Sequence, residues 1–385
     1  MRRVHLDHNA TTRIRPEARE ALLETLDRLH GNPSSVHAAG REACAMLDQA
    51  RERVAGALGV LEDEVIFTSG GTESDNLAIQ GVMGRVKAGE RMVTTMVEHS
   101  AVLGPAQALQ AQGHEVERVG VDATGEVDMP ALVEAAQGAA LVSVMAANNE
   151  LGNGTDLPSM CASIRERCGS DRPVIHTDAV QVLGKRPLDL SAWGVDLASF
   201  STHKVGGPSG CGVLVRRMGT ILRPVTFGGG QEADLRPGTE NVPAIVAGSH
   251  AIELAVQEQA AFAAHCSSLL NELWSGLSKA IPTIRLLGPP LDHPMRLPNT
   301  LNVLLDGMDG RAWVARLDME GLEASAGSAC ASGSLEPSHV LLALGLSREQ
   351  SRTGLRLSLG RTTTREDINN AVDIVGRTVA SARKS

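Results

Sequence analysis

Short apolar runs alternate with amphipathic segments through residues 64–215, and this alternation constrains the fold more than any other feature. Strands alternating with helices predict a mostly parallel sheet with helices covering both faces, which is an α/β fold. The pattern predicts seven strands, at 64–68, 91–96, 115–119, 140–146, 173–176, 197–201 and 212–215. It predicts helices at 16–29, 38–58, 72–85, 99–112, 130–136 and 158–167.

The pattern changes near residue 257 and predicts a second, smaller α+β domain. A length of 385 residues suits about two domains of ~150 residues each. We expect a large domain at 14–256, and a small domain formed by 1–13 together with 257–385. Its elements are expected to be helices at 257–280, 311–320, 338–344 and 365–378, and strands at 284–287, 300–304 and 355–358.

Charge and composition exclude several classes of protein. A net charge of −9 without a long basic run argues against direct binding of nucleic acid. No apolar stretch approaches the ~20 residues of a membrane span, and the charged N-terminal segment lacks the apolar core of a secretory signal. The six cysteines are scattered without a C-x-x-C pair, which favours free thiols in a reducing cytoplasm. We expect a cytoplasmic protein without a membrane anchor.

One lysine, Lys204, directly follows the strand at 197–201. A lysine can form a Schiff base with an aldehyde cofactor, a reaction that no other side chain offers. Ser201, Thr202 and His203 precede it and could hold an anion beside it. The alternative for this short segment is a surface lysine in a turn.

Gly70, Gly71 and Thr72 follow another strand and open a helix. Glycines allow a close approach of the backbone, and a helix N-terminus presents free N–H groups, so this segment is a candidate phosphate cradle. The alternative is an ordinary capped turn, with Thr72 as N-cap and Asp75 three residues on. The two interpretations are compatible.

Further polar side chains follow other strands of the expected sheet. Asp178 suits pairing with a protonated pyridine nitrogen, and Gln181 is placed to reach a ring hydroxyl; the alternative for Asp178 is a helix cap. His99 could stack on a flat ring and move protons, or it is a structural histidine. Asn149 is a candidate donor to a ring hydroxyl or a substrate carboxylate. In parallel sheets ligands lie outside the carboxyl ends of the strands, where all of these residues fall.

Cys330 lies in a run of small residues at 325–333. Such a run costs entropy to order, and a thiol on a mobile tether suits a nucleophile that must travel. The alternative is an inert thiol. Arg356 lies in the apolar strand at 355–358, where a guanidinium requires a partner. That partner is a substrate carboxylate or an internal carboxylate.

Taken together and in this order, these segments resemble the pyridoxal-phosphate cysteine desulfurases of the NifS/IscS type, which are class V aminotransferase-like enzymes of fold-type I. The resemblance spans nearly the whole chain. It rests on the segments at 6–12, 32–37, 68–76, 148–150, 176–181, 203–204, 236–241 and 327–330.

The resemblance implies a role for each candidate residue. Lys204, His99 and Cys330 would be catalytic: Lys204 would carry pyridoxal phosphate, His99 would stack on its ring, and Cys330 would attack the substrate's sulfur. The remaining cofactor contacts would come from Gly71, Thr72, Asn149, Asp178, Gln181, Ser201, Thr202 and His203. Asn149 and Arg356 would hold the substrate carboxylate. Thr239 would reach the partner's site in a homodimer.

The implied reaction converts L-cysteine to L-alanine and leaves a persulfide on Cys330. Sulfur would then pass to an iron–sulfur scaffold or a sulfur-relay protein for tRNA thiolation. No stable metal site is expected, Cys330 being at most a transient iron–sulfur ligand. The alternatives are a selenocysteine lyase or another class V pyridoxal-phosphate enzyme, and a non-catalytic sulfur-relay subunit.

Three departures from the family pattern leave the proposed catalytic residues untouched. Ser209 stands where the family often has lysine, and His5 stands where an aromatic residue is usual. The chain also lacks tyrosine.

Overall fold

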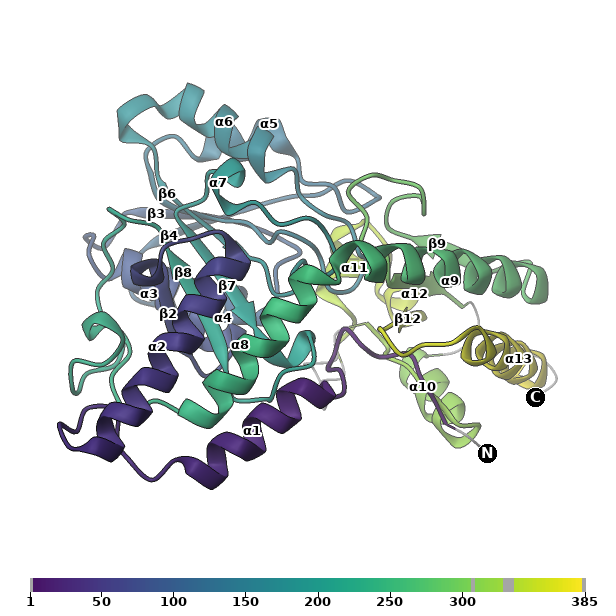
Figure 1. The fold of residues 1–385 in the computed structure, drawn as a ribbon. Coiled ribbons are helices and arrows are strands. Elements are labelled where there is room, and N and C mark those ends of the chain that lie inside the picture. Colours follow the sequence, from purple (N-terminus) through teal and green to yellow (C-terminus); the bar gives the residue numbers. More distant parts are fainter. Residues whose placement is uncertain (1–2, 306–308, 328–335, 383–385) are drawn as a thin grey trace.

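A seven-stranded sheet is the centre of the computed structural model, which describes residues 3–305, 309–327 and 336–382 (Figure 1). Its strand order is β2-β8-β7-β6-β5-β3-β4. The strands are β2 (Val65–Thr68), β3 (Arg91–Thr95), β4 (Glu115–Val119), β5 (Ala139–Ser143), β6 (Val174–Asp178), β7 (Leu197–Ser201) and β8 (Gly212–Arg216). The two antiparallel pairings of this sheet both involve β8, which pairs with β2 and β7. The predicted α/β fold with a mostly parallel sheet is confirmed.

Helices cover both faces of this sheet, as the runs of buried residues in its strands require. They are α1 (Pro16–Arg28), α2 (Ala38–Leu58), α3 (Gly71–Met83), α4 (Ser100–Ala111), α5 (Met129–Ala135), α6 (Leu157–Cys168), α7 (Leu190–Trp193) and α8 (Val242–Gln257). Successive residues of one strand face opposite sides. Val213 of β8 thus joins a core with α2, α5, α6 and α8, while Leu214 joins a second core with α3 and α4.

A second region packs beside the large sheet, with its own antiparallel sheet in the order β12-β10-β9. Its elements are β9 (Arg285–Leu287), β10 (Thr300–Leu304), β11 (Leu322–Glu323), β12 (Gly354–Ser358), α9 (Gln259–Ala280), α10 (Gly310–Met319), α11 (His339–Ala343), α12 (Arg348–Ser351) and α13 (Arg365–Ala382). The chain start contributes β1 (Val4–His5), which pairs in parallel with β11. A separate hydrophobic core joins Val4 and Leu6 to α9, β10, β12 and α13. The domain division at 14–256 stays a prediction.

Helix α8 is the main element that the sequence patterns did not predict. Asn241 caps it by accepting from the amide of Ala244, and Pro243 stands in its first turn. Only Glu258 separates α8 from α9, so the expected helix start at 257 falls two residues early (Figure 1). Most other predicted elements match within a few residues. None of the described helices combines the length and apolarity that a membrane crossing requires.

We expect Ile252→Ala to destabilise the protein by about 3 kcal/mol, because it leaves a cavity beneath α8. Ile252 is 1% exposed within the core that α8 shares with the sheet. A lower urea midpoint of unfolding would report the loss. Met218→Ala is the matched control, since Met218 is 63% exposed and its removal should change stability by less than about 0.5 kcal/mol. Equal midpoints for the two variants would contradict this assignment of α8 to the core.

Candidate active site

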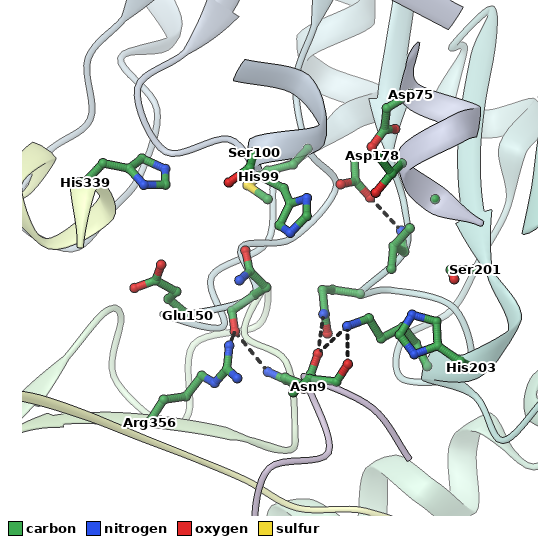
Figure 2. A pocket seen from close by; sticks show the side chains of 18 residues that line it. Asn9, Asp75, His99, Ser100, Glu150, Asp178, Ser201, His203, His339 and Arg356 are labelled. Carbon is green, nitrogen blue, oxygen red and sulfur yellow. Dashed lines mark hydrogen bonds between the residues drawn. The ribbon is translucent and has the colours of Figure 1, made fainter. Parts of the chain in front are cut away.

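A cavity of about 300 Å³ lies where the large sheet meets the second region (Figure 2). The chain start, the first turn of α3, the start of α4 and the segments after β5, β6 and β7 surround it, together with α11 and β12. Most of the residues that line it have polar side chains, and they come from distant parts of the sequence: Asn9, Ala10, Gly71, Thr72, Asp75, His99, Ser100, Met145, Asn149, Glu150, Asp178, Val180, Gln181, Ser201, His203, Lys204, His339 and Arg356.

Lys204 ends a short 3₁₀ turn that directly follows β7. Its Nζ donates to the backbone oxygens of Asn9 at 2.7 Å and Ala10 at 2.6 Å (Figure 2). Both acceptors belong to the N-terminal segment, which crosses the cavity floor. The amine that the sequence analysis singled out is therefore held at the cavity by backbone carbonyls.

The start of α3 forms a compact polar corner with Ser201 and His203. Gly70 occupies the N-cap position and no side chain caps the helix, so Thr72 and Asp75 do not form the capped turn considered as an alternative. A Cβ on Gly71 would lie 2.8 Å from Val180 Cγ2, so any larger residue there would require the Val180 side chain to move. His203 bonds Thr11 Oγ1 through Nδ1 at 3.2 Å, and burial beside Lys204 lowers its pKa to about 4. The corner suits a phosphate group.

Asp178 ends β6 and contributes its carboxylate to the opposite wall of the cavity. Its Oδ1 accepts from the amide of Val180 at 2.9 Å, a local turn contact rather than a helix cap. Burial and the nearby Asp75 raise its pKa to about 6. No Lys or Arg pairs with Asp178 in the described part of the chain, so its charge is available for a cationic ligand.

His99 caps α4 with its own side chain. Its Nδ1 accepts from the amide of Ala101 at 3.2 Å, which fixes the plane of the ring at the cavity. The preceding residue, Glu98, is fully buried, and its Oε1 accepts from Thr95 Oγ1 and from the amide of Met145. Burial raises the pKa of Glu98 to about 8, so this carboxyl is neutral at pH 7.

Arg356 enters the cavity from β12 and is 1% exposed. Its Nη2 donates to Asp7 Oδ1 at 2.7 Å, and its Nη1 donates to the backbone oxygen of Asn149 at 3.1 Å. The internal ion pair considered from the sequence is thus present. However, Nε is buried with no acceptor among the described residues, which leaves a donor for a ligand carboxylate.

Asn9 was not given a role from the sequence, although it lies in the segment 6–12 that carried the resemblance. Its Nδ2 donates to Asn149 O and Thr300 Oγ1, and its Oδ1 accepts from Lys185 Nζ. Lys185 also donates to Gln181 Oε1 at 2.6 Å, and burial beside Lys204 lowers its pKa to about 7. Lys185 could not be recognised as a site residue from the sequence, because one partner, Asn9, is far away in the chain and the other, Gln181, carries no charge.

Asp75 was also missed, but its position did carry a signal. It shares the buried face of α3 with Ala78, Ile79 and Val82, where an acidic side chain is unusual. It lines the cavity close to Asp178 (Figure 2).

Two predicted site residues, Thr202 and Thr239, do not line the cavity, and a third, Cys330, cannot be placed. Thr202 does not line the cavity, because its hydroxyl donates to the backbone oxygens of Pro208 and Cys211 and thereby shapes the turn. Thr239 is exposed and lies outside the cavity lining. Cys330 lies outside the described residues. On either side of that gap, Ser338 Oγ donates to Glu150 Oε2 at 2.7 Å, and Gly327 packs against the same carboxylate.

A lysine, a buried carboxylate and an anion cradle at the carboxyl ends of parallel strands define a fold-type I pyridoxal-phosphate enzyme. The chain belongs to the aminotransferase class-V family, whose model matches residues 4–371.

Curated relatives in this family are similar over nearly their whole length. The chain is 41% identical over 384 residues to the "Cysteine desulfurase IscS" of Dictyoglomus turgidum, covering 99% of this chain and 96% of the relative. It is 40% identical over 389 residues to the "IscS-like cysteine desulfurase" of Mycobacterium tuberculosis, with coverages of 99% and 97%.

Solved structures show the same fold. A "NIFS-LIKE PROTEIN" superposes with a TM-score of 0.91 at 35% identity, covering 98% of this chain and 100% of that one. "SspA in complex with cysteine" superposes with a TM-score of 0.78 at 31% identity, covering 92% and 98%.

The family uses pyridoxal 5′-phosphate, and the residues present fit that group. The start of α3 with Ser201 and His203 suits its phosphate. The Asp178 carboxylate, which no Lys or Arg of the described residues pairs, suits its ring nitrogen. Lys204 Nζ lies on the same cavity and suits its aldehyde.

We expect the stability of Glu98→Gln, relative to the unchanged protein, to rise as the pH increases from 5 to 7. The unfolded carboxyl ionises near pH 4.5 whereas the folded one stays protonated until about pH 8. The unchanged protein therefore loses stability across this window, by at most about 1.4 kcal/mol per pH unit, while glutamine does not titrate. Urea unfolding at both pH values measures the difference.

Glu166→Gln is the control, because Glu166 is exposed on α6. A pH slope in Glu98→Gln that equals that of the unchanged protein would show that Glu98 is ionised in the fold.

Proposed function

We propose that this protein is a cysteine desulfurase, which takes sulfur from L-cysteine and releases L-alanine. The observation that carries the proposal is the convergence of Lys204, Asp178 and Arg356 on one cavity from three distant elements. Among the reactions of the family, the similarity to curated cysteine desulfurases over nearly the whole chain favours removal of sulfur from cysteine.

The side chains of the cavity have distinct tasks in this proposal. Bound pyridoxal phosphate supplies an aldehyde for the substrate amine and a ring that withdraws electrons. Arg356, through its free Nε–H, and Asn149 orient the substrate carboxylate. Lys204 moves protons at the substrate carbons, and His99 covers the ring.

Cys330 is the proposed sulfur acceptor. Its thiolate attacks the sulfur of the bound cysteine, the carbon–sulfur bond breaks, and a Cys330 persulfide forms. The carbon that loses sulfur gains a proton, so the amino-acid product is alanine. A second thiol then accepts the outer sulfur, and release as sulfide consumes two electrons from a thiol reductant.

The proposal extends to assembly and partners. Thr239 is exposed, as a residue that completes a partner's site must be, so we propose a homodimer. We place the enzyme in the cytoplasm, with an iron–sulfur scaffold or a sulfur-relay protein as acceptor.

We expect Lys204→Ala and Cys330→Ser to abolish conversion of L-cysteine to L-alanine for different reasons. Lys204→Ala removes the amine that binds the cofactor, so the visible absorbance of the bound cofactor should change. Cys330→Ser should keep that absorbance but show no added sulfur mass on the protein after incubation with cysteine. Alanine and sulfide assays, visible spectra and intact-protein mass measure these outcomes.

The matched control is Cys44→Ser, because Cys44 is a partly exposed cysteine outside the cavity lining. Alanine formation by Cys330→Ser at the unchanged rate would refute the assigned sulfur acceptor. Release of selenium from selenocysteine by that variant would instead favour a selenocysteine lyase. Wild-type protein that binds the cofactor but never turns over cysteine would favour the non-catalytic alternative.

We expect Arg356→Lys to raise the KM for L-cysteine by about tenfold or more, with a smaller change in kcat. Lysine keeps the charge but cannot donate to Asp7, Asn149 and a substrate carboxylate in one plane. Steady-state kinetics measure both parameters. Arg352→Lys, at an exposed position near β12, should leave both unchanged. An unaltered KM in Arg356→Lys would contradict a role in carboxylate binding.

A further inference from the structure

Asp75 presents a buried carboxylate to the cavity without any hydrogen-bond partner. It is 1% exposed, and both Oδ1 and Oδ2 lack a donor within the described residues. A buried carboxylate left without donors costs several kcal/mol in general, so its retention calls for a ligand or a proton. It does not cap α3, because Gly70 holds the N-cap position.

Among the described residues, no lysine or arginine forms an ion pair or a hydrogen bond with Asp75. His176 Nε2 lies 3.5 Å from Asp75 Oδ1, but this ring already bonds Ser199 Oγ at 2.9 Å and Ser143 Oγ at 2.8 Å. Each hydroxyl can donate or accept, so a neutral imidazole satisfies both contacts. His99 and Glu98 also interact with this acidic cluster, and Glu98 is a neutral acid at pH 7.

Asp75 interacts electrostatically with Asp178 and helps to raise the pKa of that carboxyl. Both carboxylates line the same end of the cavity, away from Arg356 (Figure 2). The ion pair of Arg356 is made with Asp7, on the opposite side. Two neighbouring carboxylates in a dry site cannot both stay ionised unless a proton or a cation joins them. A protonated group of a ligand bound at this end of the cavity would interact favourably with both carboxylates.

We propose that Asp75 is a positioning residue for the ring nitrogen of the cofactor: acting through Asp178, its negative charge keeps that nitrogen protonated. The inference rests on cofactor binding, which is part of the proposed function, and not on the choice of substrate. A protonated nitrogen makes the ring a stronger electron acceptor. Asp75 needs no hydrogen bond for this task, since a charge acts through space in a site of low dielectric.

The test compares two ligands that differ only at the ring nitrogen. Cofactor-free protein is titrated with pyridoxal phosphate and with its 1-deaza analogue, in which a C–H replaces the nitrogen and cannot be protonated. The ratio used here is the Kd of the 1-deaza analogue divided by the Kd of pyridoxal phosphate. It measures what the ring nitrogen contributes to binding. Visible absorbance reports both titrations and does not depend on catalysis.

We expect Asp75→Asn to weaken pyridoxal phosphate binding by about tenfold, because one attractive charge is lost. Binding of the 1-deaza analogue should stay equal or become tighter, because Asp178 is less strongly repelled. The ratio of Kd values therefore falls by about tenfold or more. Asp75→Ala should give the same fall and serves as the second variant if the asparagine disturbs folding.

Asp178→Asn serves as the reference for complete loss of the nitrogen's contribution. Asp373→Asn, at an exposed position on α13, should leave the ratio unchanged. If the unchanged protein binds pyridoxal phosphate but both Asp75 variants keep its ratio, Asp75 carries no charge that reaches the nitrogen and the inference is wrong. If the unchanged protein binds neither ligand, cofactor binding itself is refuted.

Discussion

The arrangement of the cavity depends on the hydrogen bonds of one buried residue, Asn9. Its amide bonds Asn149 from the large sheet, Thr300 from the second region, and Lys185 behind the cavity. Its backbone oxygen accepts from both Lys204 and Gln181. One residue of an extended N-terminal segment thereby fixes groups from four separate elements. An asparagine suits this position because its amide both donates and accepts while carrying no charge.

The basic and acidic groups of the cavity are unevenly distributed. Lys204, Lys185 and Arg356 all bond residues of the N-terminal segment. Asp75 and Asp178 lie at the other end of the cavity from Arg356, while Glu150 lies on the same side as Arg356 (Figure 2). A ligand with an anionic end and a cationic ring matches this distribution. The same distribution explains the direction of the perturbed pKa values, because burial and like-charged neighbours disfavour the charged forms of Lys185 and Asp178.

The sheet and most of its helices were predictable from the sequence because their apolar periodicity is local. Residues at the carboxyl ends of strands, such as Lys204 and Asp178, were predictable for the same reason, since parallel strands bring those ends together. Helix α8 was missed because nine of its 16 residues are buried and its apolar residues leave no clear polar face. Asn9 and Lys185 were missed because their importance lies in contacts with residues far away in the sequence. Cys330 was a candidate because of the small residues around it, and it lies outside the described residues.

The N-terminal segment also bears on the order in which the chain is completed during synthesis. Residues 4–12 leave the ribosome before β11 and β12, yet β1 pairs with β11, Asp7 bonds Arg356, and Asn9 bonds Thr300. Domains generally fold as they emerge. Here the large sheet can form before the N-terminal segment that binds Lys204 has a fixed position. That segment is held in place only after β12, which carries Arg356, has been synthesised. A nascent chain that has built its central sheet is therefore still an incomplete enzyme.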